Sequence, residues 1–509
     1  MVTLPLNRES RLEDYFSSYR MHIIGSQQHF ESPFGVRRII YADWTASGRC
    51  YGPIEDYIRR EILPFVGNTH TGTTVTGSSM SKAYEEAKRI IKKHVNAGSD
   101  DVLIFCGSGM TAAVHKLQRI MGMRVPERIA AYTGKEWPPC DEALKPVVFV
   151  TAMEHHSNQT SWLETIADVA VIRMGEDGNV DMAHFGSLLE QHKHRVYKIA
   201  AVTACSNVTG IRTDYHGIAK LIHAYGGWCF VDFACAAPYC EMDMHPGEND
   251  AYLDAIYFSP HKLLGGPGTP GILIFNKHLY NNKIPDQPGG GALKYTNPWG
   301  LREYVANIEQ REDSGTPPFL QGIKAAMCIR LKEEMGISNM LKREEELLAT
   351  IFNRLPDMKY VQVLQANVTK RLGVVSFIVT GVHYNLITRL LNDRFGIQTR
   401  GGCSCAGTYG HVLLDVDKAR SYAILDAIRS GDLSCKPGWV RLSIHPTMTN
   451  AEINFILDAI EITVANIHEW EKDYYYDHNS NEYFFKGEAD GVGRKISEWF
   501  DVGRWQELT

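Results

Sequence analysis

The chain has 509 residues, of which 44% are hydrophobic and 22% charged, and its formal net charge is −6. This length predicts two or more domains. The acidic balance gives no sign of the basic patch that nucleic acid requires, and no apolar run approaches the ~20 residues that span a bilayer. The N-terminal stretch has no apolar signal region and carries Glu9, Glu13 and Asp14. We therefore expect a cytoplasmic protein without nucleic-acid or membrane partners.

Between about residues 85 and 275, short apolar runs alternate with amphipathic, helix-like stretches. Such alternation predicts βαβ units and a mostly parallel sheet that is covered on both faces. A helix over 214–226 would be capped by Thr213 or Asp214 and ended by Gly226. The strand candidates are "DVLIFCGSG", "PVVFVTAMEHH", "YKIAAVTACSN", "GGWCFVDFACA", "DAIYFSPHK" and "GILIF".

The remaining elements predict a second, smaller α+β domain. One long helix is expected over 319–355, followed by the strands "RLGVVSFIVTG" and "WVRLSIH" and the helices "NLITRLLNDRFG" and "NAEINFILDAIEITVANI". We predict a segment at 1–40 that packs on the small domain, a large domain at 41–318 with an insertion at about 120–146, a small domain at 319–465, and an unassigned extension at 466–509.

Polar side chains follow the apolar runs at the points where the strands should end. Ligands of parallel α/β sheets bind at the carboxyl ends of the strands, so this regularity predicts one binding site there. The residues concerned are Ser108, Thr111, His155, His156, Asn207, Asp232, His261 and Lys262.

Lys262 is the residue with the most informative surroundings, since it lies in the glycine-rich run "FSPHKLLGGPGTPGILIF". Lysine is rarely buried, because its ammonium is costly to desolvate. A desolvated lysine has a lowered pKa and attacks carbonyls. A cofactor that carries an aldehyde and a phosphate would suit it. Asp232 could keep a ring nitrogen of that cofactor protonated, and the turn "CGSGMT" could bind the phosphate at a helix N-terminus.

Three further residues fit such a cofactor and its substrate. His155 could cover the ring, Asn207 could bond a phenolic oxygen, and Arg441 could clamp a carboxylate through two hydrogen bonds. Each also has a commoner structural explanation when taken alone, such as a strand end, a turn or a surface arginine. Taken alone, Asp232 could likewise be a helix cap, and Lys262 could be a surface lysine. The set as a whole favours the cofactor site.

At this point the chain resembles the class V aminotransferase family of fold type I pyridoxal-phosphate enzymes, and within it the cysteine desulfurase and selenocysteine lyase branch. The resemblance covers roughly residues 40–465. It rests on "YADWTASG", "MEHHSN", "SNVTG", "VDFACA", "FSPHKLLGGPGTPGIL", "REDSGTP", "TRGGCSCAG" and "VRLSIH", which are similar to the family's motifs. It implies an α/β fold with a large cofactor-binding domain and a small C-terminal domain, and pyridoxal 5'-phosphate as cofactor.

The resemblance also implies roles for individual residues. Lys262 would bond the cofactor aldehyde, with Asp232, His155 and Asn207 around the ring and Arg441 and Arg400 for the substrate. Thr316 would reach the phosphate of a neighbouring subunit, which implies a homodimer. Cys235 stands where the family usually has glutamine at the ring oxygen. The residues expected at the phosphate are Ser108, Gly109, Ser259 and His261.

The chain has eleven cysteines, and in a long non-secreted protein we expect these to be free thiols. Most of them are expected to be packing residues. Cys405 aligns with the sulfur-accepting cysteine of the desulfurases, whose action needs a thiolate. His156 and His411 are candidates for the base that forms it. In this interpretation L-cysteine is converted to L-alanine with a persulfide on Cys405, and a sulfur-acceptor protein becomes a partner.

Three alternatives stay open. Cys405 could have no sulfur chemistry in an aminotransferase, C–S lyase or epimerase of the same family. The fold could serve a non-enzymatic scaffold, although such a scaffold would need neither Lys262 nor Asp232. Cys403, Cys405 and His411 could instead form a metal-binding module, although a C-x-C pair alone is weak evidence for the four ligands of a zinc site.

Overall fold

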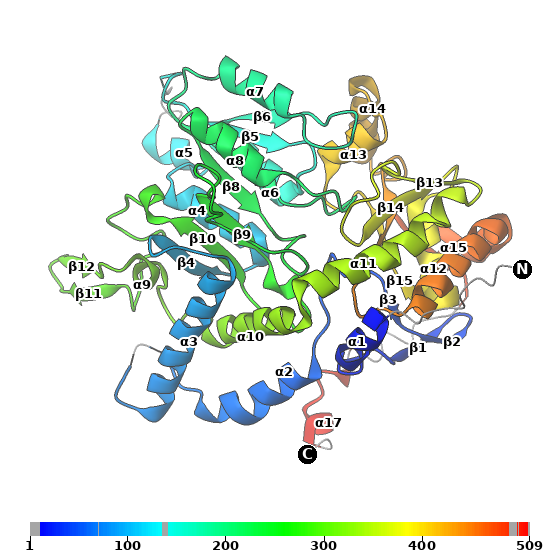
Figure 1. Cartoon of the computed structure of the whole chain (residues 1–509), viewed down its shortest axis with the longest axis horizontal. Coiled ribbons are helices and arrows are strands. Elements are labelled where there is room, and N and C mark those ends of the chain that lie inside the picture. The colour runs from blue at the N-terminus through cyan, green and yellow to red at the C-terminus, as the bar shows by residue number, and fades with distance from the viewer. Residues whose placement is uncertain (1–10, 70, 135–140, 488–495, 497, 507–509) are drawn as a thin grey trace, which may run out of the picture.

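The computed structural model describes residues 11–69, 71–134, 141–487, 496 and 498–506. Figure 1 shows a large sheet with helices on one side of the molecule and a smaller sheet with helices on the other. Within the described part of the chain, no helix is long and apolar enough to cross a membrane.

The large sheet has seven strands in the order β4-β10-β9-β8-β7-β5-β6. Only β10 runs antiparallel to its neighbours, so the mostly parallel sheet is confirmed. The sequence analysis anticipated six of these strands and missed β6. The strands are β4 (Asp101–Cys106), β5 (Val147–Thr151), β6 (Asp168–Ile172), β7 (Lys198–Thr203), β8 (Trp228–Asp232), β9 (Ala255–Phe258) and β10 (Gly271–Asn276).

Apolar cores lie on both faces of this sheet, because side chains alternate along each strand. In β4, Leu103 and Phe105 belong to one core, whereas Val102 and Ile104 belong to the other. The helices of this half are α3 (Val75–His94), α4 (Gly109–Ile120), α5 (Ile129–Thr133), α6 (His156–Leu163), α7 (Met182–Gln191), α8 (Tyr215–Ala224) and α9 (Ile308–Glu312).

Local sequence signals explain where α8 begins and ends. The Asp214 carboxylate accepts a hydrogen bond from the Gly217 N–H at 3.0 Å, as expected of an N-cap. Gly226, at φ 69°, follows the last turn in the left-handed conformation that suits glycine.

The expected single helix over 319–355 is wrong, because it is two helices, α10 (Phe319–Met335) and α11 (Ile337–Phe352). Gly336 separates them at φ 76°, which an α-helix cannot accommodate. In Figure 1, α10 lies beneath the large sheet and α11 continues toward the smaller one. The glycine thus redirects the chain from one half of the molecule to the other.

The smaller sheet is antiparallel, with the order β13-β14-β17-β16. Its strands are β13 (Val361–Val363), β14 (Val374–Val379), β16 (Arg400–Gly402) and β17 (Trp439–Ser443). Its helices are α12 (Tyr384–Phe395), α13 (Gly407–Leu413), α14 (Lys418–Arg429) and α15 (Asn450–Trp470), the last of which opens with a capping box between Thr449 and Glu452. This half confirms the expected α+β character.

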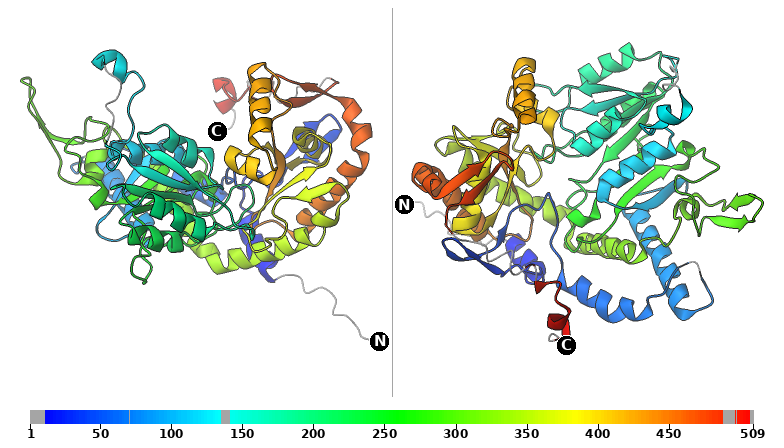
Figure 2. Two further views of the ribbon diagram at one scale, coloured as in Figure 1. Left: turned by 90° about the horizontal axis from the view of Figure 1, so that it is seen from above. Right: turned by 180° about the vertical axis from the view of Figure 1, so that it is seen from behind.

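An N-terminal hairpin, β1–β2, and a C-terminal hairpin, β18–β19, both contact α12. In Figure 2, the blue N-terminal segment lies against the smaller half of the molecule. The Phe34 and Phe485 rings lie 5.4 Å apart, and the Tyr474 hydroxyl donates to Asp393 at 3.0 Å. The N-terminal elements are α1 (Arg11–Arg20), β1 (His29–Ser32), β2 (Gly35–Arg38), β3 (Ile40–Tyr41), which pairs with β15 (Ile397–Gln398), and α2 (Gly52–Tyr57). The tail holds β18 (Tyr474–Asp477), β19 (Glu482–Phe485) and α17 (Val502–Gln506).

The expected insertion at about 120–146 contains α5, and its residues 135–140 fall outside the described residues. Between the large sheet and α10, β11 (Leu293–Thr296) and β12 (Arg302–Tyr304) form a hairpin that projects away from the large sheet in Figure 1. The bounds of the four segments remain predictions.

Candidate active site

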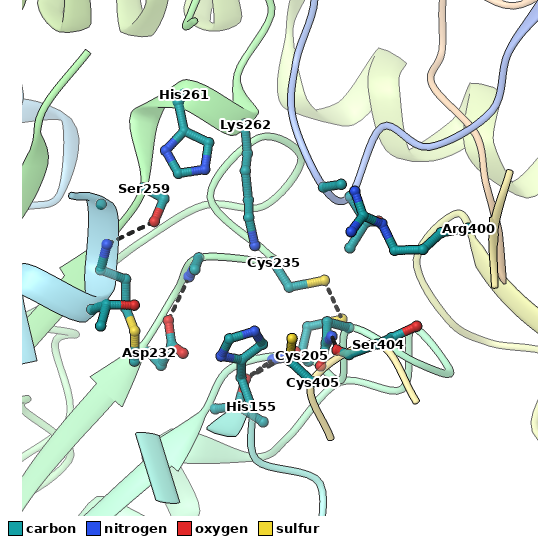
Figure 3. Close-up of a pocket in the computed structure, with 18 of the residues that line it drawn as sticks. His155, Cys205, Asp232, Cys235, Ser259, His261, Lys262, Arg400, Ser404 and Cys405 are labelled. Atoms are coloured by element: carbon teal, nitrogen blue, oxygen red, sulfur yellow. Dashed lines mark hydrogen bonds between the residues drawn. The ribbon is translucent and has the colours of Figure 1, made fainter. Parts of the chain in front are cut away.

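A cavity of about 250 Å³ opens where the carboxyl ends of the central strands meet the smaller half of the molecule. Its walls come from the segments that follow β3, β4, β5, β7, β8 and β9 and from the strands β16 and β17 with the loop after β16 (Figure 3). Twelve predicted site residues line it: Ser108, Gly109, His155, Asn207, Asp232, Cys235, Ser259, His261, Lys262, Arg400, Cys405 and Arg441.

Lys262 ends a short 3₁₀ turn, Pro260–Lys262, directly after β9. Its N–H donates to the Ser259 carbonyl at 3.1 Å, so the turn fixes the direction of the side chain. Figure 3 shows the side chain extending from this turn toward Cys235. Burial lowers the pKa of the Lys262 amine below its usual value. The amine is therefore more nucleophilic than an exposed lysine.

Asp232 and His155 both lie near Lys262, and burial dominates the pKa of each. Asp232 ends β8, and its Oδ1 accepts a hydrogen bond from the Ala234 N–H at 2.8 Å. Burial raises the pKa of Asp232 to about 6. His155 caps α6 by accepting from the Ser157 N–H at 3.1 Å, and burial together with the charge of Lys262 lowers its pKa to about 3. The imidazole is thus neutral at physiological pH.

The N-terminus of α4 meets the lysine turn at the predicted phosphate site. The Ser259 hydroxyl accepts from the Met110 N–H at 2.8 Å. A Cβ on Gly109, at φ 60°, would lie 2.8 Å from that hydroxyl and 3.0 Å from His261 Cε1. A glycine is therefore required for this close approach. Helix N-termini with free N–H groups and hydroxyls are typical anion sites.

Asp43 is a site residue that the sequence analysis did not single out. Its carboxylate binds Arg441 Nη2 at 2.7 Å and Arg400 Nη2 at 2.9 Å. Arg441 also donates to the Asn207 carbonyl at 3.1 Å, while its Nε is buried without a partner among the described residues. One carboxylate thus holds both candidate substrate arginines in place. Asp43 lies in the motif "YADWTASG", but the sequence alone does not show that this aspartate faces the two arginines.

The loop that carries Cys405 is tied to the large half of the molecule through its backbone. Asn207 Nδ2 donates to the Ser404 carbonyl at 2.7 Å, and the His156 N–H donates to the Cys405 carbonyl at 2.7 Å. Ser404 and Cys405 both have positive φ values, 52° and 57°, which cost energy for residues other than glycine. These bonds hold the exposed Cys405 at the cavity.

The two histidines suggested as bases for Cys405 have other partners. His156 Nε2 accepts from the Gly407 N–H at 2.8 Å. His411 contacts the Gly407 carbonyl at 2.8 Å and the Ser421 hydroxyl at 2.9 Å. Neither ring is among the residues that line the cavity, so this geometry does not support a role as base for either histidine.

The metal alternative also loses its support. Among the described residues, no three His, Cys, Asp or Glu side chains come together in a way that could hold a metal ion. His411 in particular is committed to Gly407 and Ser421 rather than to Cys403 and Cys405.

Thr316 does not belong to the cavity of its own chain. It lies exposed in the segment before α10, and its hydroxyl is 3.4 Å from Asn68 Oδ1. A role at a partner's phosphate remains a prediction.

The cavity also holds a pair of thiols of which the sequence analysis named only one. Cys235 Sγ lies 3.8 Å from Cys205 Sγ, and both side chains line the cavity. Nothing in the sequence pairs them, because 30 positions separate the two cysteines.

Several observations fit pyridoxal phosphate. The cavity volume is close to the lower end of the usual range for small-molecule sites, about 300–1,000 Å³. Asn207 Oδ1 is buried without a hydrogen-bond partner among the described residues, although the residue faces the cavity. A buried amine, a buried carboxylate and a helix N-terminus match an aldehyde, a ring nitrogen and a phosphate, respectively.

Comparisons with known proteins identify the family. The model of the family "Aminotransferase class-V" matches residues 40–456. The chain belongs to the class V aminotransferase family. This family is pyridoxal-phosphate dependent and acts on amino acids.

Its curated relatives include "Probable cysteine desulfurase" of Staphylococcus aureus, 28% identical over 382 residues, 73% of this chain and 84% of that protein. The Staphylococcus epidermidis counterpart is 27% identical over 388 residues, 74% and 85% of the two chains. The expected resemblance to cysteine desulfurases is thus confirmed as a likeness.

Solved structures confirm the predicted fold. Apo cysteine desulfurase from Thermococcus onnurineus superposes with a TM-score of 0.67 at 21% identity, over 84% of this chain and 95% of that one. The Escherichia coli cysteine desulfurase CsdA gives a TM-score of 0.67 at 18% identity, over 88% and 98%.

We predict that Asp43→Asn destabilises the protein. The Arg441 side chain is only 3% exposed, and removing the partner of a buried charge costs about 3–5 kcal/mol. Asp56→Asn is the matched control, because Asp56 pairs with Arg59 on the surface, where ion pairs contribute little. Denaturant unfolding of both variants measures the difference. Equal and small losses of stability would contradict the structural role of Asp43.

We also predict that Asp232→Asn stabilises the cofactor-free protein at neutral pH. The folded pKa of about 6 exceeds the ordinary 3.8. The stability contributed by the protonated carboxyl is therefore present below about pH 4 and is lost as the pH rises through 6. The ionised carboxylate then costs up to about 3 kcal/mol.

The measurement is the difference in unfolding free energy between Asp232→Asn and the wild type. It should be small near pH 4 and should grow in favour of the variant toward pH 7. A difference that does not change with pH would contradict the raised pKa of Asp232.

Proposed function

We propose that this chain is a pyridoxal-phosphate enzyme that converts L-cysteine to L-alanine and transfers the sulfur to Cys405. The observation that supports this most is one cavity that unites the buried amine of Lys262, the buried carboxylate of Asp232 and the thiol-bearing loop of Cys405. The likeness to proteins called cysteine desulfurases supports the choice of substrate.

Pyridoxal phosphate, when bound, supplies an aldehyde that binds amines and a ring that withdraws electrons from the substrate. Lys262 would hold the aldehyde, and Asp232 would keep the ring nitrogen protonated. His155 would cover the ring face as a neutral imidazole, and Asn207 would accept from a protonated ring oxygen at its unpartnered Oδ1, or donate to that oxygen through the second N–H of its amide. The phosphate would lie at the N-terminus of α4, against Gly109, Ser259 and His261.

The substrate carboxylate would lie against Arg441, whose guanidinium is oriented by its ion pair with Asp43. Arg441 is nearly fully buried, whereas the Arg400 side chain is 50% exposed, so Arg441 provides the firmer contact. A planar guanidinium suits a carboxylate because two N–H groups can donate in parallel. This contact would orient the substrate amine toward Lys262.

Lys262 would take the α-proton of the substrate, for which its lowered pKa suits it at neutral pH. The Cys405 thiolate would attack the substrate sulfur and form an S–S bond, while the carbon–sulfur bond breaks. The carbon gains the electron pair and then a proton, which gives alanine. Cys405 then carries a persulfide, which a thiol or an acceptor protein can take over.

A homodimer belongs to the proposal. Thr316 lies exposed and outside the cavity of its own chain, as a residue that serves a neighbouring subunit must. Its partner residues would be those at the N-terminus of α4. A sulfur-acceptor protein is proposed as a further partner, because an enzyme-bound persulfide must be unloaded for turnover.

We predict that Cys405→Ser abolishes sulfide and alanine formation from L-cysteine. Cys403→Ser is the matched control in the same loop, and it should retain activity, because Cys403 is not among the residues that line the cavity. Purified full-length protein is incubated with the cofactor, L-cysteine and a thiol reductant, and both products are measured.

The two products separate the alternatives. Alanine and sulfide from the wild type and from Cys403→Ser, but not from Cys405→Ser, would support the proposal. Turnover that is indifferent to Cys405, or turnover of other amino acids without sulfide, would contradict sulfur transfer by Cys405. That outcome would favour an aminotransferase, lyase or epimerase activity.

A further inference from the structure

Cys205 and Cys235 form a buried pair of thiols in the wall of the candidate active site. Their Sγ atoms lie 3.8 Å apart, and the residues are only 1% and 5% exposed. Figure 3 shows the contact beside the end of the Lys262 side chain. Cys205 follows β7 and Cys235 follows β8.

The backbone keeps these two thiols together. β7 and β8 are adjacent and parallel, and Thr203 is paired with Asp232 at their carboxyl ends. The Ala204 N–H donates to the Asp232 carbonyl at 2.9 Å. Cys205 and Cys235 thus follow the paired residues Thr203 and Asp232 by two and three positions.

The side chains are also oriented toward each other. Cys205 Sγ lies 3.5 Å and Cys235 Sγ 3.7 Å from the Ser206 carbonyl oxygen, so both sulfurs converge on one acceptor. A disulfide bond is about 2 Å long, and small rotations about the side-chain torsions would close the remaining gap. The pair is therefore close enough to bond without rearrangement of the two strands.

The two thiols differ in reactivity. The contact with Cys205 and the nearby Lys262 amine lower the pKa of Cys235, whereas burial raises that of Cys205. Cys235 is also the more exposed of the two toward the cavity. Cys235 is thus suited to attack an oxidant and Cys205 to complete the bond, as in other vicinal thiol pairs.

We propose that Cys205 and Cys235 are a redox-active dithiol that a peroxide oxidises to a disulfide inside the candidate active site. Cys235 attacks hydrogen peroxide, the O–O bond breaks, and a sulfenic acid and one water result. The Cys205 thiol then displaces a second water from that sulfenic acid and forms the S–S bond. The two thiols lose two electrons in total, and the peroxide gains them.

The modification is reversible and changes the wall next to Lys262. A small dithiol reduces the bond by thiol–disulfide exchange. Only a small oxidant suits the pair, because both sulfurs are nearly covered. The pair needs neither cofactor nor turnover, so the proposal stands independently of the proposed function.

To test the proposal, the purified full-length protein is treated with hydrogen peroxide, and the remaining thiols are blocked during denaturation. The tryptic peptides are then mapped by mass spectrometry. Cys205 lies in the peptide 199–212, whereas Cys235 shares the peptide 221–262 with Cys229 and Cys240. A second cleavage after Phe233 and Tyr239 separates these three cysteines. We expect a linked pair of peptides that joins Cys205 to Cys235 and that disappears after reduction.

Three variants serve as controls. Cys205→Ala and Cys235→Ala should each lose the linked peptide, whereas Cys229→Ala should keep it, because Cys229 lies in the core at the start of β8. A link from Cys205 to Cys240 or Cys229, or one between Cys403 and Cys405 with Cys205 and Cys235 still reduced, would overturn the proposal. Oxidation of Cys405 alone would overturn it as well. The disulfide map of the wild-type protein tests the proposal even if a variant fails to fold.

Discussion

The burial of a lysine amine at the carboxyl end of a parallel sheet is the constraint on which the site depends. Desolvation disfavours the ammonium of Lys262, and the residues around it compensate only in part. Burial also disfavours the charged form of Asp232, and it raises the pKa of that carboxyl to about 6. Two such groups in one cavity cost stability, which is the usual sign of a site built for chemistry rather than for folding.

The smaller half of the molecule completes the site through a few polar contacts. Asp43 follows β3, which pairs with β15, and its carboxylate binds Arg441 and Arg400 of the smaller sheet. Asn207 and His156 hold the backbone of the loop around Cys405. Because these contacts use backbone carbonyls and buried charges, the position of the thiol is set by the docking of the two halves.

The sequence predicted much of this arrangement, because its signals are local. Alternating apolar runs identify strands, and polar residues that follow them mark the edge where Lys262 and Asp232 meet. The break at Gly336 was missed because a single glycine in a helical pattern does not reveal its φ value. The pairing of β18 with β19 and their packing on α12 were missed because such contacts join distant segments.

The same reason explains the misses within the site. Asp43 contacts Arg441 and Cys205 contacts Cys235, and both partners lie far away in the sequence. The sequence alone therefore did not identify these two residues as part of the site. His156 and His411 looked suited to act as bases, but the fold directs their ring nitrogens to Gly407 and Ser421. Residue type and spacing suggest chemistry, and only tertiary contacts show which groups are free to perform it.

Borohydride reduction tests whether Lys262 bonds the aldehyde of pyridoxal phosphate. Purified protein is incubated with pyridoxal phosphate, reduced with borohydride, digested and mapped by mass spectrometry. We expect a visible absorption band before reduction and the cofactor's mass on the peptide that contains Lys262, both absent from Lys262→Ala. A wild type without the band, or with the cofactor on a different lysine, would rule out Lys262 as the cofactor-binding residue.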